Sequence, residues 1–255
     1  MNIIDSLRPT AYKVNARWLP AMMIALPVVA LLAGVLYRFV PWNNIEQVPW
    51  KAFGSFAGAF IVIGVASIVL FAEKIRDRGK HLQEEYFCKA SAFPTTEFLL
   101  WSNDTIELEI KKLLHTAIRR DFDIRLCSCE EEGKDISKAR RLICSAVNQI
   151  RESVKDGRLL IDYNIRYGYY RNIIGSADWG MALAIVCNIV SLFIGNVYVF
   201  TAEASLIFYF LWLLYKREEI LNEYSQEYAR RLFSEYMAWS NERKKMGQLS
   251  GHLEA

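Results

Sequence analysis

The side chains that could carry chemistry in this sequence are few, and most of them stand apart. Glu203 is the only charged residue in the otherwise uncharged run from Trp179 to Tyr215. A carboxyl group in such a run could line a pore or act as a proton-sensitive latch. It could also stay neutral and hydrogen-bond to a neighbouring helix, for example at Asn188. If this run folds back on itself at residues 199–202, Glu203 lies instead at the membrane surface.

No sequence motif for catalysis or metal binding is present. The chain contains no phosphate-binding glycine loop, no HExxH and no GxSxG, and its three histidines are isolated. Cys127 and Cys129 precede three glutamates, but they lack the second ligand pair of a structural zinc site. We therefore expect a solvated, mobile loop at this point, no metal, no cofactor, no catalytic residues and no enzymatic activity.

The segment DYNIRYGYYRNIIGSADWG, residues 162–180, gathers four tyrosines and two arginines just before the long apolar run. Tyrosine favours the headgroup region of a membrane, and arginine there binds lipid phosphates or nearby acids. We interpret residues 163–178 as an interfacial elbow that couples a soluble module to membrane helices. A plain aromatic belt is the alternative. The residues expected to couple are Asn164, Tyr167, Gly168, Arg171 and Asn172.

Long apolar segments must position these residues. Hydrophobic residues make up 53% of the 255 residues, yet charged residues still make up 23%, which indicates membrane stretches separated by soluble ones. Residues 19–37 and 52–72 are each long enough to span a bilayer, which takes about 20 residues. The first is too long for the apolar part of a cleaved signal peptide. In the second, Gly54 and Gly58 form a GxxxG pattern that suits close helix packing, although glycines are also common in membrane helices.

The uncharged run at residues 179–215 is too long for one upright span, because a single helix of that length would measure about 55 Å. The only adjacent pair of turn-forming residues within it is Gly195 and Asn196. This predicts a tight hairpin of two helices, residues 179–194 and 197–215. One long tilted helix is the alternative.

Lysines and arginines precede the first span and follow both the second span and the hairpin, whereas the loops within each pair carry few of them. The positive-inside rule then places both termini and the central segment in the cytosol. We expect a multi-pass protein of the bacterial inner membrane. Its predicted parts are a cytosolic N-terminus (1–17), two spans (18–72), a cytosolic module (73–162), the elbow (163–178), the hairpin (179–215) and a C-terminal amphipathic helix with its tail (216–255).

The fold class expected is therefore a mainly α membrane protein with four transmembrane helices in two pairs. The central module reads as small and α or α+β, with amphipathic helices at 105–122 and 136–157 and short strands at 96–101 and 123–126. A long cytosolic helix follows the hairpin and carries an apolar stripe, which could bind a partner or pack on the chain's own module. The residues of this stripe singled out for interaction are Tyr224, Tyr228, Leu232 and Tyr236.

Three segments together resemble a known kind of protein. The stretch PTTEFLL at 94–100, two helices, and NIRYGYYRNIIG before a membrane hairpin are similar to uncharacterised bacterial inner-membrane proteins associated with accessory and anti-phage defence gene clusters. The similarity covers residues 94–196, and a recurrent Tyr-Gly-x-x-Arg-Asn core matches Tyr167, Gly168, Arg171 and Asn172. The resemblance implies an effector or sensor that acts at the membrane.

Our leading hypothesis is a self-associating membrane protein whose cytosolic module receives a signal and passes it through the elbow to the spans. The expected output is altered permeability, or a pore, used in anti-phage defence. The alternatives are a scaffold that recruits a cytosolic enzyme and a channel or transporter subunit. The expected partners are the lipid bilayer, further copies of the chain and a cytosolic protein, but not nucleic acid, because the net charge of +3 is small.

Overall fold

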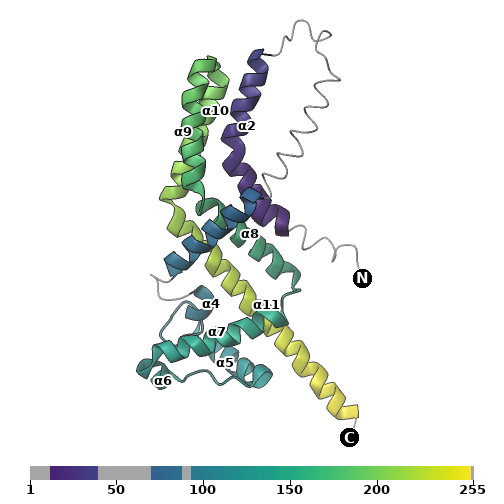
Figure 1. The fold of residues 1–255 in the computed structure, drawn as a ribbon. Coiled ribbons are helices and arrows are strands. Elements are labelled where there is room, and N and C mark those ends of the chain that lie inside the picture. The colour runs from purple at the N-terminus through teal and green to yellow at the C-terminus, as the bar shows by residue number, and fades with distance from the viewer. Residues whose placement is uncertain (1–11, 40–69, 88–92, 254–255) are drawn as a thin grey trace. The chain divides into compact units, whose positions relative to one another are not determined.

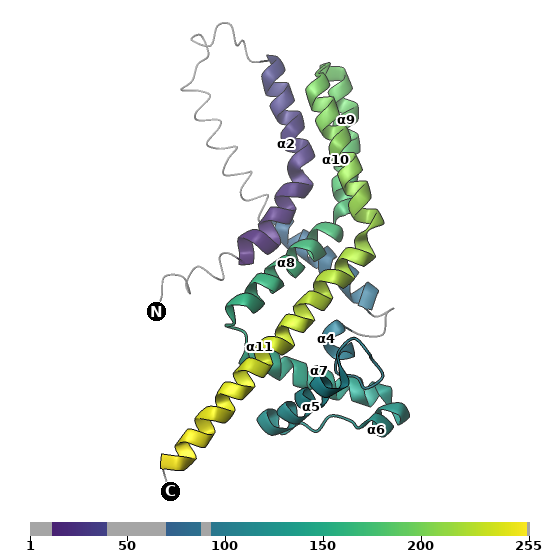
Figure 2. The same ribbon diagram turned by 180° about the vertical axis from the view of Figure 1, so that it is seen from behind.

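The computed structural model describes residues 12–39, 70–87 and 93–253, which are mainly helical and contain no β-strand (Figures 1 and 2). The chain forms two compact units. The first unit comprises Met1–Glu84 and Gly168–Leu221, and the second unit comprises Glu85–Tyr167 and Asn222–Ala255. The three boundaries between them fall within helical segments, namely residues 70–87, α8 (Arg158–Ile174) and α11 (Arg217–Leu253).

In the part of the chain that the structure describes, the first unit contains three helices that are long and apolar enough to cross a membrane, within the segments Val14–Val35, Ala177–Ile194 and Val197–Tyr215. The first segment combines a π-helical turn, η1 (Val14–Trp18), with α2 (Leu19–Phe39). The other two are α9 (Ala177–Ile194) and α10 (Val197–Tyr215). The expected second span, residues 52–72 with Gly54 and Gly58, lies outside the described residues except at its end. Residues 70–87 are helical. The four-span arrangement stays a prediction.

The predicted turn between the last two apolar helices is confirmed. α9 ends at Gly195, whose φ of 70° is a left-handed conformation that glycine adopts without steric cost. The Asn196 side chain then caps α10 by accepting hydrogen bonds from the backbone N–H groups of Tyr198 and Val199, at 3.1 and 3.3 Å. Two helices therefore replace the single tilted helix that was the alternative.

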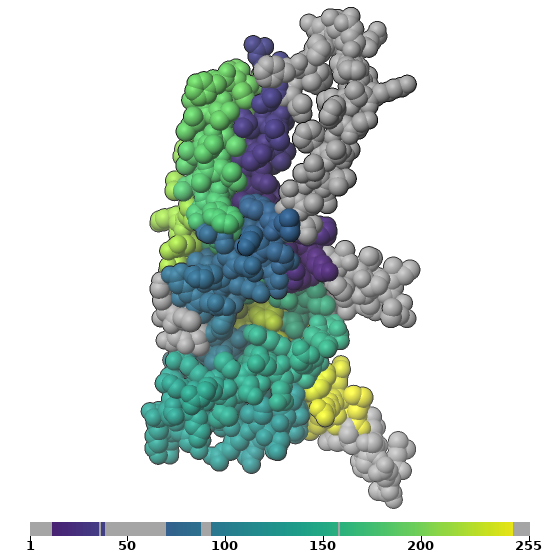
Figure 3. All heavy atoms as spheres, viewed as in Figure 1, coloured from purple at the N-terminus to yellow at the C-terminus, as the bar shows by residue number. Residues whose placement is uncertain are grey.

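α2 packs along this hairpin, and the purple α2 lies against the green α9 in Figure 3. The hairpin's outward side chains are large and apolar. Such a surface is typical of helices that face lipid, because soluble proteins rarely expose so much contiguous apolar area. The exposed residues of this kind include Val186, Ile189, Leu192, Phe193, Phe208, Leu211 and Trp212.

The second unit is a small helical module around one hydrophobic core. Its described helices include α4 (Pro94–Glu97), α5 (Leu108–Phe122), α6 (Cys129–Lys134), α7 (Ile136–Ser153), the first part of α8 and the later part of α11. α5 and α7 each bury one apolar face, as their amphipathic pattern predicts. The core includes Leu114, Ile118, Ile143, Ile150, Leu232, Phe233 and Tyr236.

The two short strands expected in this module, at residues 96–101 and 123–126, are not present. Of the two fold classes predicted for the module, α is therefore right and α+β is wrong. Pro94 begins a helical turn after the extended Phe93, and turns follow as far as residue 102. The buried Lys111 ammonium donates hydrogen bonds to the carbonyls of Leu100, at 2.6 Å, and Asn103. These carbonyls are thereby satisfied without a neighbouring strand. Residues 123–128 have no regular structure.

The loop expected to be solvated and mobile after Cys127 is instead the short helix α6. Ser128 caps it, and the Glu131 carboxylate accepts a hydrogen bond from the Ser128 backbone N–H, at 2.8 Å. The buried Glu132 carboxylate accepts hydrogen bonds from two backbone N–H groups, those of Trp101 and Ser102, at 2.8 and 2.9 Å. The acidic run is thus a structural element of the module.

The cysteines with described positions are free thiols. Cys127 and Cys187 are buried, whereas Cys129 and Cys144 are exposed on the second unit.

Candidate functional site

The predicted elbow is a helix followed by a sharp turn. α8 ends at Ile174, Gly175 and Ser176 form the turn, and α9 begins at Ala177. Asn172, in the last turn of α8, is only 1% exposed, and its side-chain amide donates a 2.7 Å hydrogen bond to the Ala16 carbonyl. Ala16 lies in the π-helical turn η1, a rare form that recurs at functional sites. This bond ties the end of α8 to the start of the first apolar helix.

Arg171 extends the connection to a third segment. Its guanidinium donates a 3.1 Å hydrogen bond to the Gln83 side-chain carbonyl, on the helical residues 70–87, and a 3.2 Å bond to the Asn172 side-chain oxygen. One arginine thus orients the Asn172 amide and holds a neighbouring helix. Planar guanidinium groups suit this double role, because their donors project in fixed directions.

Glycines bring these segments into direct backbone contact. A Cβ atom added at Gly175 would lie 2.6 Å from the Gly79 Cα, which is closer than real Cβ atoms approach. A Cβ added at Gly168 would lie 3.1 Å from the Ala16 Cβ. Side chains larger than hydrogen would therefore push the segments apart at Gly79 and Gly175. We call this cluster the glycine junction, formed by Ala16, Gly79, Gln83, Gly168, Arg171, Asn172 and Gly175.

Arg78 closes the junction on the side where α9 begins. Its Nε donates a 3.1 Å hydrogen bond to the Gly175 carbonyl, and its terminal nitrogen pairs with Asp178 at 2.5 Å. The guanidinium also lies 4.5 Å from the centre of the Trp179 ring, a cation–π contact. Trp179 in turn stacks on Phe71, with ring centroids 6.0 Å apart.

A second group of charges lies on the same helical residues 70–87. Glu73 accepts hydrogen bonds from Arg17 and Arg76, each at 3.0 Å. The bond from Arg76, supported by the charges of both arginines, holds the pKa of Glu73 below its usual range despite partial desolvation. The carboxylate thus stays ionised and links the start of the first apolar helix to residues 70–87.

The structure unites three of the five residues predicted to couple and separates the other two. Gly168, Arg171 and Asn172 belong to the glycine junction. Tyr167 is 9% exposed and stacks on Tyr228 within the second unit, with ring centroids 6.1 Å apart, so it is not a lipid-facing anchor. Asn164 is half-buried about two turns before Asn172 in α8.

Sequence reasoning missed Ala16, Gly79, Gln83 and Arg78. Only Gly79 carried a usable signal, because a glycine inside the charged helix DRGKH costs about 1 kcal/mol relative to alanine. Such a glycine indicates close packing at that position, and here the backbone of Gly79 contacts Gly175.

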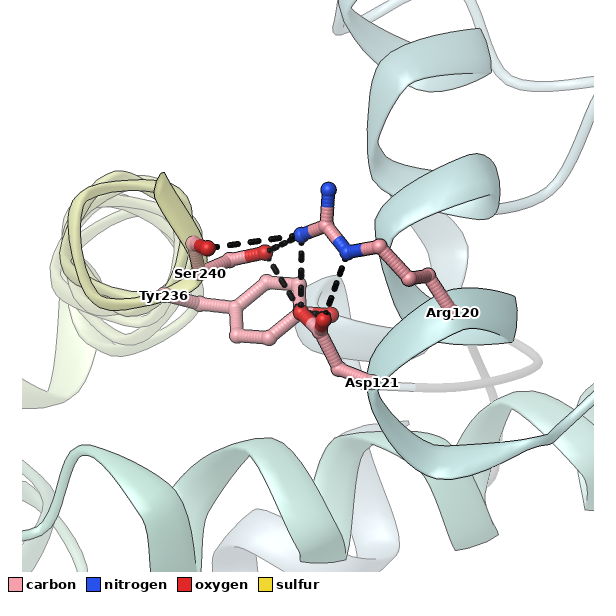
Figure 4. Close-up of polar contacts among 4 residues, drawn as sticks. All are labelled: Arg120, Asp121, Tyr236 and Ser240. Atoms are coloured by element: carbon pink, nitrogen blue, oxygen red, sulfur yellow. Dashed lines mark hydrogen bonds and ion pairs between the residues drawn. The ribbon is translucent and has the colours of Figure 1, made fainter. Parts of the chain in front are cut away.

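A polar cluster in the second unit was also missed (Figure 4). Asp121, whose side chain is 4% exposed, accepts hydrogen bonds from Arg120 at 2.8 and 3.2 Å, from the Tyr236 hydroxyl at 3.1 Å and from the Ser240 hydroxyl. Burial alone would raise the pKa of Asp121. The bonds from Arg120, Ser240 and Tyr236 outweigh it and keep the pKa below its ordinary value. This cluster fastens α11 to α5.

The stripe predicted as a C-terminal interaction face packs on the chain's own module. Leu232 and Tyr236 are 0% exposed in the core of the second unit, so at these positions the docking interpretation is wrong and the alternative is right. Tyr224 and Tyr228 are half-buried. The reason is that Leu232, Phe233 and Tyr236 complete a core that the short helices could not close alone.

The two polar residues predicted inside the hairpin do not bind each other. Asn188 donates a 2.9 Å hydrogen bond to the Phe200 carbonyl. Glu203 is 0% exposed, and neither carboxyl oxygen has a hydrogen-bond partner among the described residues. Because the turn lies at Gly195 and Asn196, Glu203 is well inside α10, and the alternative turn at residues 199–202 is wrong.

The chain offers no likeness from which a function could be transferred. No protein-family model matches it, and neither curated proteins nor solved structures give a match.

Proposed function

We propose that this chain is a non-enzymatic membrane protein in which a cytosolic helical module controls apolar membrane helices. The glycine junction carries the proposal. α8 begins among residues of the second unit, and its last turn contains Asn172, whose buried amide is bonded to the start of the first apolar helix. α9 starts three residues beyond α8. A displacement of α8 along or about its axis therefore acts on the starts of two apolar helices, the first one and α9.

The energies involved are suited to coupling. Breaking the bond between Asn172 and Ala16 without replacing it leaves a buried amide unpaired, which costs about 1–3 kcal/mol. Coupling free energies between protein sites are typically of the same size, about 1–3 kcal/mol. Gly79 and Gly175 meet backbone to backbone, so no long side chain can absorb a shift by changing rotamer. This tight contact favours two discrete arrangements over gradual bending.

The proposed output is a change in membrane permeability. Glu203 supports this part of the proposal, because its buried carboxyl group has no hydrogen-bond partner among the described residues. Such a group is costly in an apolar hairpin and marks functional positions in membrane proteins. Repacking of α9 and α10 would bring this group to water. Use in anti-phage defence follows from the sequence resemblance alone. A scaffold that docks an enzyme on the C-terminal stripe is less favoured, since Leu232 and Tyr236 are buried.

The test compares two asparagines on the same helix. Asn172→Leu removes the bond to Ala16 while keeping the number and branching of the side-chain heavy atoms, and Asn164→Leu makes the same change outside the junction. Each full-length protein is expressed in bacteria, its membrane level is measured by fractionation, and membrane potential is followed with a dye, with and without phage challenge.

We expect wild type and Asn164→Leu to depolarise the cells, and Asn172→Leu to insert equally well but leave the potential intact. Arg171→Ala should behave like Asn172→Leu. The proposal is wrong if Asn172→Leu depolarises cells as wild type does at equal membrane level. It is also wrong if wild type leaves the potential unchanged under both conditions.

A further inference from the structure

α5 carries two apolar stripes, and only one of them is used by the core of the second unit. Leu114 and Ile118 are fully buried, whereas Ile110 is 44% exposed and Leu113 is 58% exposed. Ile110 and Leu113 are three residues apart and so share one face of α5, and the half-buried Ile106 lies just before the helix. This second stripe is exposed along the first half of α5.

The exposed stripe borders a groove between the start of α5 and α11. The groove encloses about 470 Å³, and both of its walls belong to the second unit. Leu114 and Phe233, which are both buried, form its floor. Ile106, Ile110 and Met237 line its sides. The groove is therefore apolar at its base and open to an apolar side chain from outside.

The groove also carries one charge of each sign. Glu107 on one wall and Arg230 on the other are both exposed. Their neighbours are engaged elsewhere, because Glu109 pairs with Lys112 and Arg231 pairs with Glu235. Among the residues that the structure describes, no ion pair involves Glu107 or Arg230.

We propose that this groove binds a second copy of the same chain across a two-fold axis. In a two-fold interface the same patch faces itself, so each surface must complement itself. An exposed apolar stripe beside an apolar groove meets that requirement, since each copy can insert Leu113 into the groove of the other. The charges fit as well, because Glu107 of each copy can face Arg230 of its partner. A strongly acidic or basic peptide would meet a like charge on one wall.

This inference goes beyond the coupling function and does not depend on it. The membrane-potential assay measures the effect of substitutions in the glycine junction, whereas the tests below measure only association through the second unit. Failure of one proposal is therefore distinguishable from failure of the other.

The first test exchanges charges between copies. Glu107→Arg places arginines on both sides of the interface, and Arg230→Glu places acids on both sides, so each variant should repel itself. Both residues are exposed, and circular dichroism checks that each variant is folded. Full-length proteins with different tags are purified in detergent, separately and after co-expression, and association is measured by light scattering and co-purification.

We expect each single variant to self-associate at least about tenfold more weakly than wild type. The two variants together should associate again, because every contact between them joins an arginine to a glutamate. If Glu107 and Arg230 acted only on each other within one chain, mixing the two variants would not restore association. A monomeric wild type, single variants that associate normally, or no rescue in the mixture would each overturn the proposal.

The second test locates the contact directly, so that association through membrane helices cannot imitate it. A photo-crosslinking amino acid replaces Leu113, or Lys155 as an exposed control on the same unit. We expect a covalent dimer at residue 113, with the crosslink falling on residues 230–237 of the other copy, and none at residue 155. Crosslinks from residue 113 to a different protein only would show that another partner occupies the groove and overturn the proposal.

Discussion

Replacing Asp121 with alanine should loosen the attachment of α11 to α5 within the second unit. Asp121 accepts hydrogen bonds from Arg120, Tyr236 and Ser240, and these residues come from two helices that are far apart in the sequence (Figure 4). Tyr236 and Ser240 are both 0% exposed. In the alanine variant their hydroxyl groups lose an acceptor in a place that water does not reach.

The expected cost follows from the burial of each donor. A buried polar group left without its partner costs about 1–3 kcal/mol. Tyr236 bears this cost fully, and Ser240 bears part of it because Arg120 also donates to Ser240. The Arg120 side chain is 41% exposed and regains water, so its pair with Asp121 adds less than about 1 kcal/mol. The sum is about 2–4 kcal/mol for the local stability of α11 on α5.

Amide hydrogen exchange followed by mass spectrometry can measure this in the full-length protein. A loss of about 2–4 kcal/mol corresponds to exchange about 30-fold to 1,000-fold faster in peptides 108–122 and 229–241. Peptides from α9 and α10 provide the internal control and should not change. Tyr236→Phe removes one donor only and should accelerate exchange by about fivefold, which corresponds to about 1 kcal/mol.

The same carboxylate should make this attachment sensitive to acid. The pKa of Asp121 is lower in the folded chain than its unfolded value of about 3.9, so its contribution is complete above that pH and disappears as the pH falls through the folded pKa. The difference in protection between wild type and Asp121→Asn should therefore shrink below about pH 4. If Asp121→Ala exchanges within about threefold of wild type, or if α9 and α10 accelerate equally, the assigned role of this cluster is wrong.

Three further substitutions test other parts of the structure. Gly195→Ala should destabilise the hairpin by about 1 kcal/mol, because its φ of 70° is left-handed, whereas Gly133→Ala, with open space around the added methyl group, should not destabilise the second unit. Equal melting temperatures for both variants in detergent would contradict this. Lys111→Met should lower the stability of the second unit by about 2–3 kcal/mol, because two buried loop carbonyls lose their charged donor. Unchanged hydrogen exchange in residues 98–105 would show that the ammonium group is dispensable. Glu203→Leu should retain or raise the thermal stability of the purified protein, since the carboxyl group has no described hydrogen-bond partner to lose. A fall in melting temperature of the Glu203 variant would reveal a stabilising role of that carboxyl group.

Local chemistry was predictable where it acts over a few residues. Gly195 and Asn196 supply a left-handed helix end and a helix cap, so the hairpin turn is encoded by two neighbouring side chains. The apolar spacing in α5 and α7 likewise defines their buried faces. Such features need no information from distant parts of the chain.

Contacts between distant segments were not predictable in the same way. Asn172 and Ala16 are 156 residues apart, and nothing in either neighbourhood specifies the other. The apolar run at Phe98–Leu100 has a strand-like composition, yet the ammonium group of Lys111, eleven residues beyond Leu100, binds a backbone carbonyl there. Tertiary context overrides intrinsic strand preference in this way.

The C-terminal stripe shows a related limit. Its period of four residues correctly indicates one apolar face, but periodicity does not reveal what covers that face. Only the placement of Leu232 and Tyr236 in the core of the second unit decides the matter. The same holds for Asp121, which reads as an ordinary surface acid at the end of a helix.

Two exposed thiols in the described part of the second unit can report on which side of the membrane that unit lies. Cys129 and Cys144 are open to reagents, whereas Cys127 and Cys187 are shielded. A membrane-impermeant maleimide applied to spheroplasts would label the exposed pair only if the second unit faced outward, and lysed cells would give the complete signal. Replacing Cys129 and Cys144 by serine would confirm which sulfur atoms reacted. The orientation of the protein can thus be read without fusing a bulky domain to any of its loops.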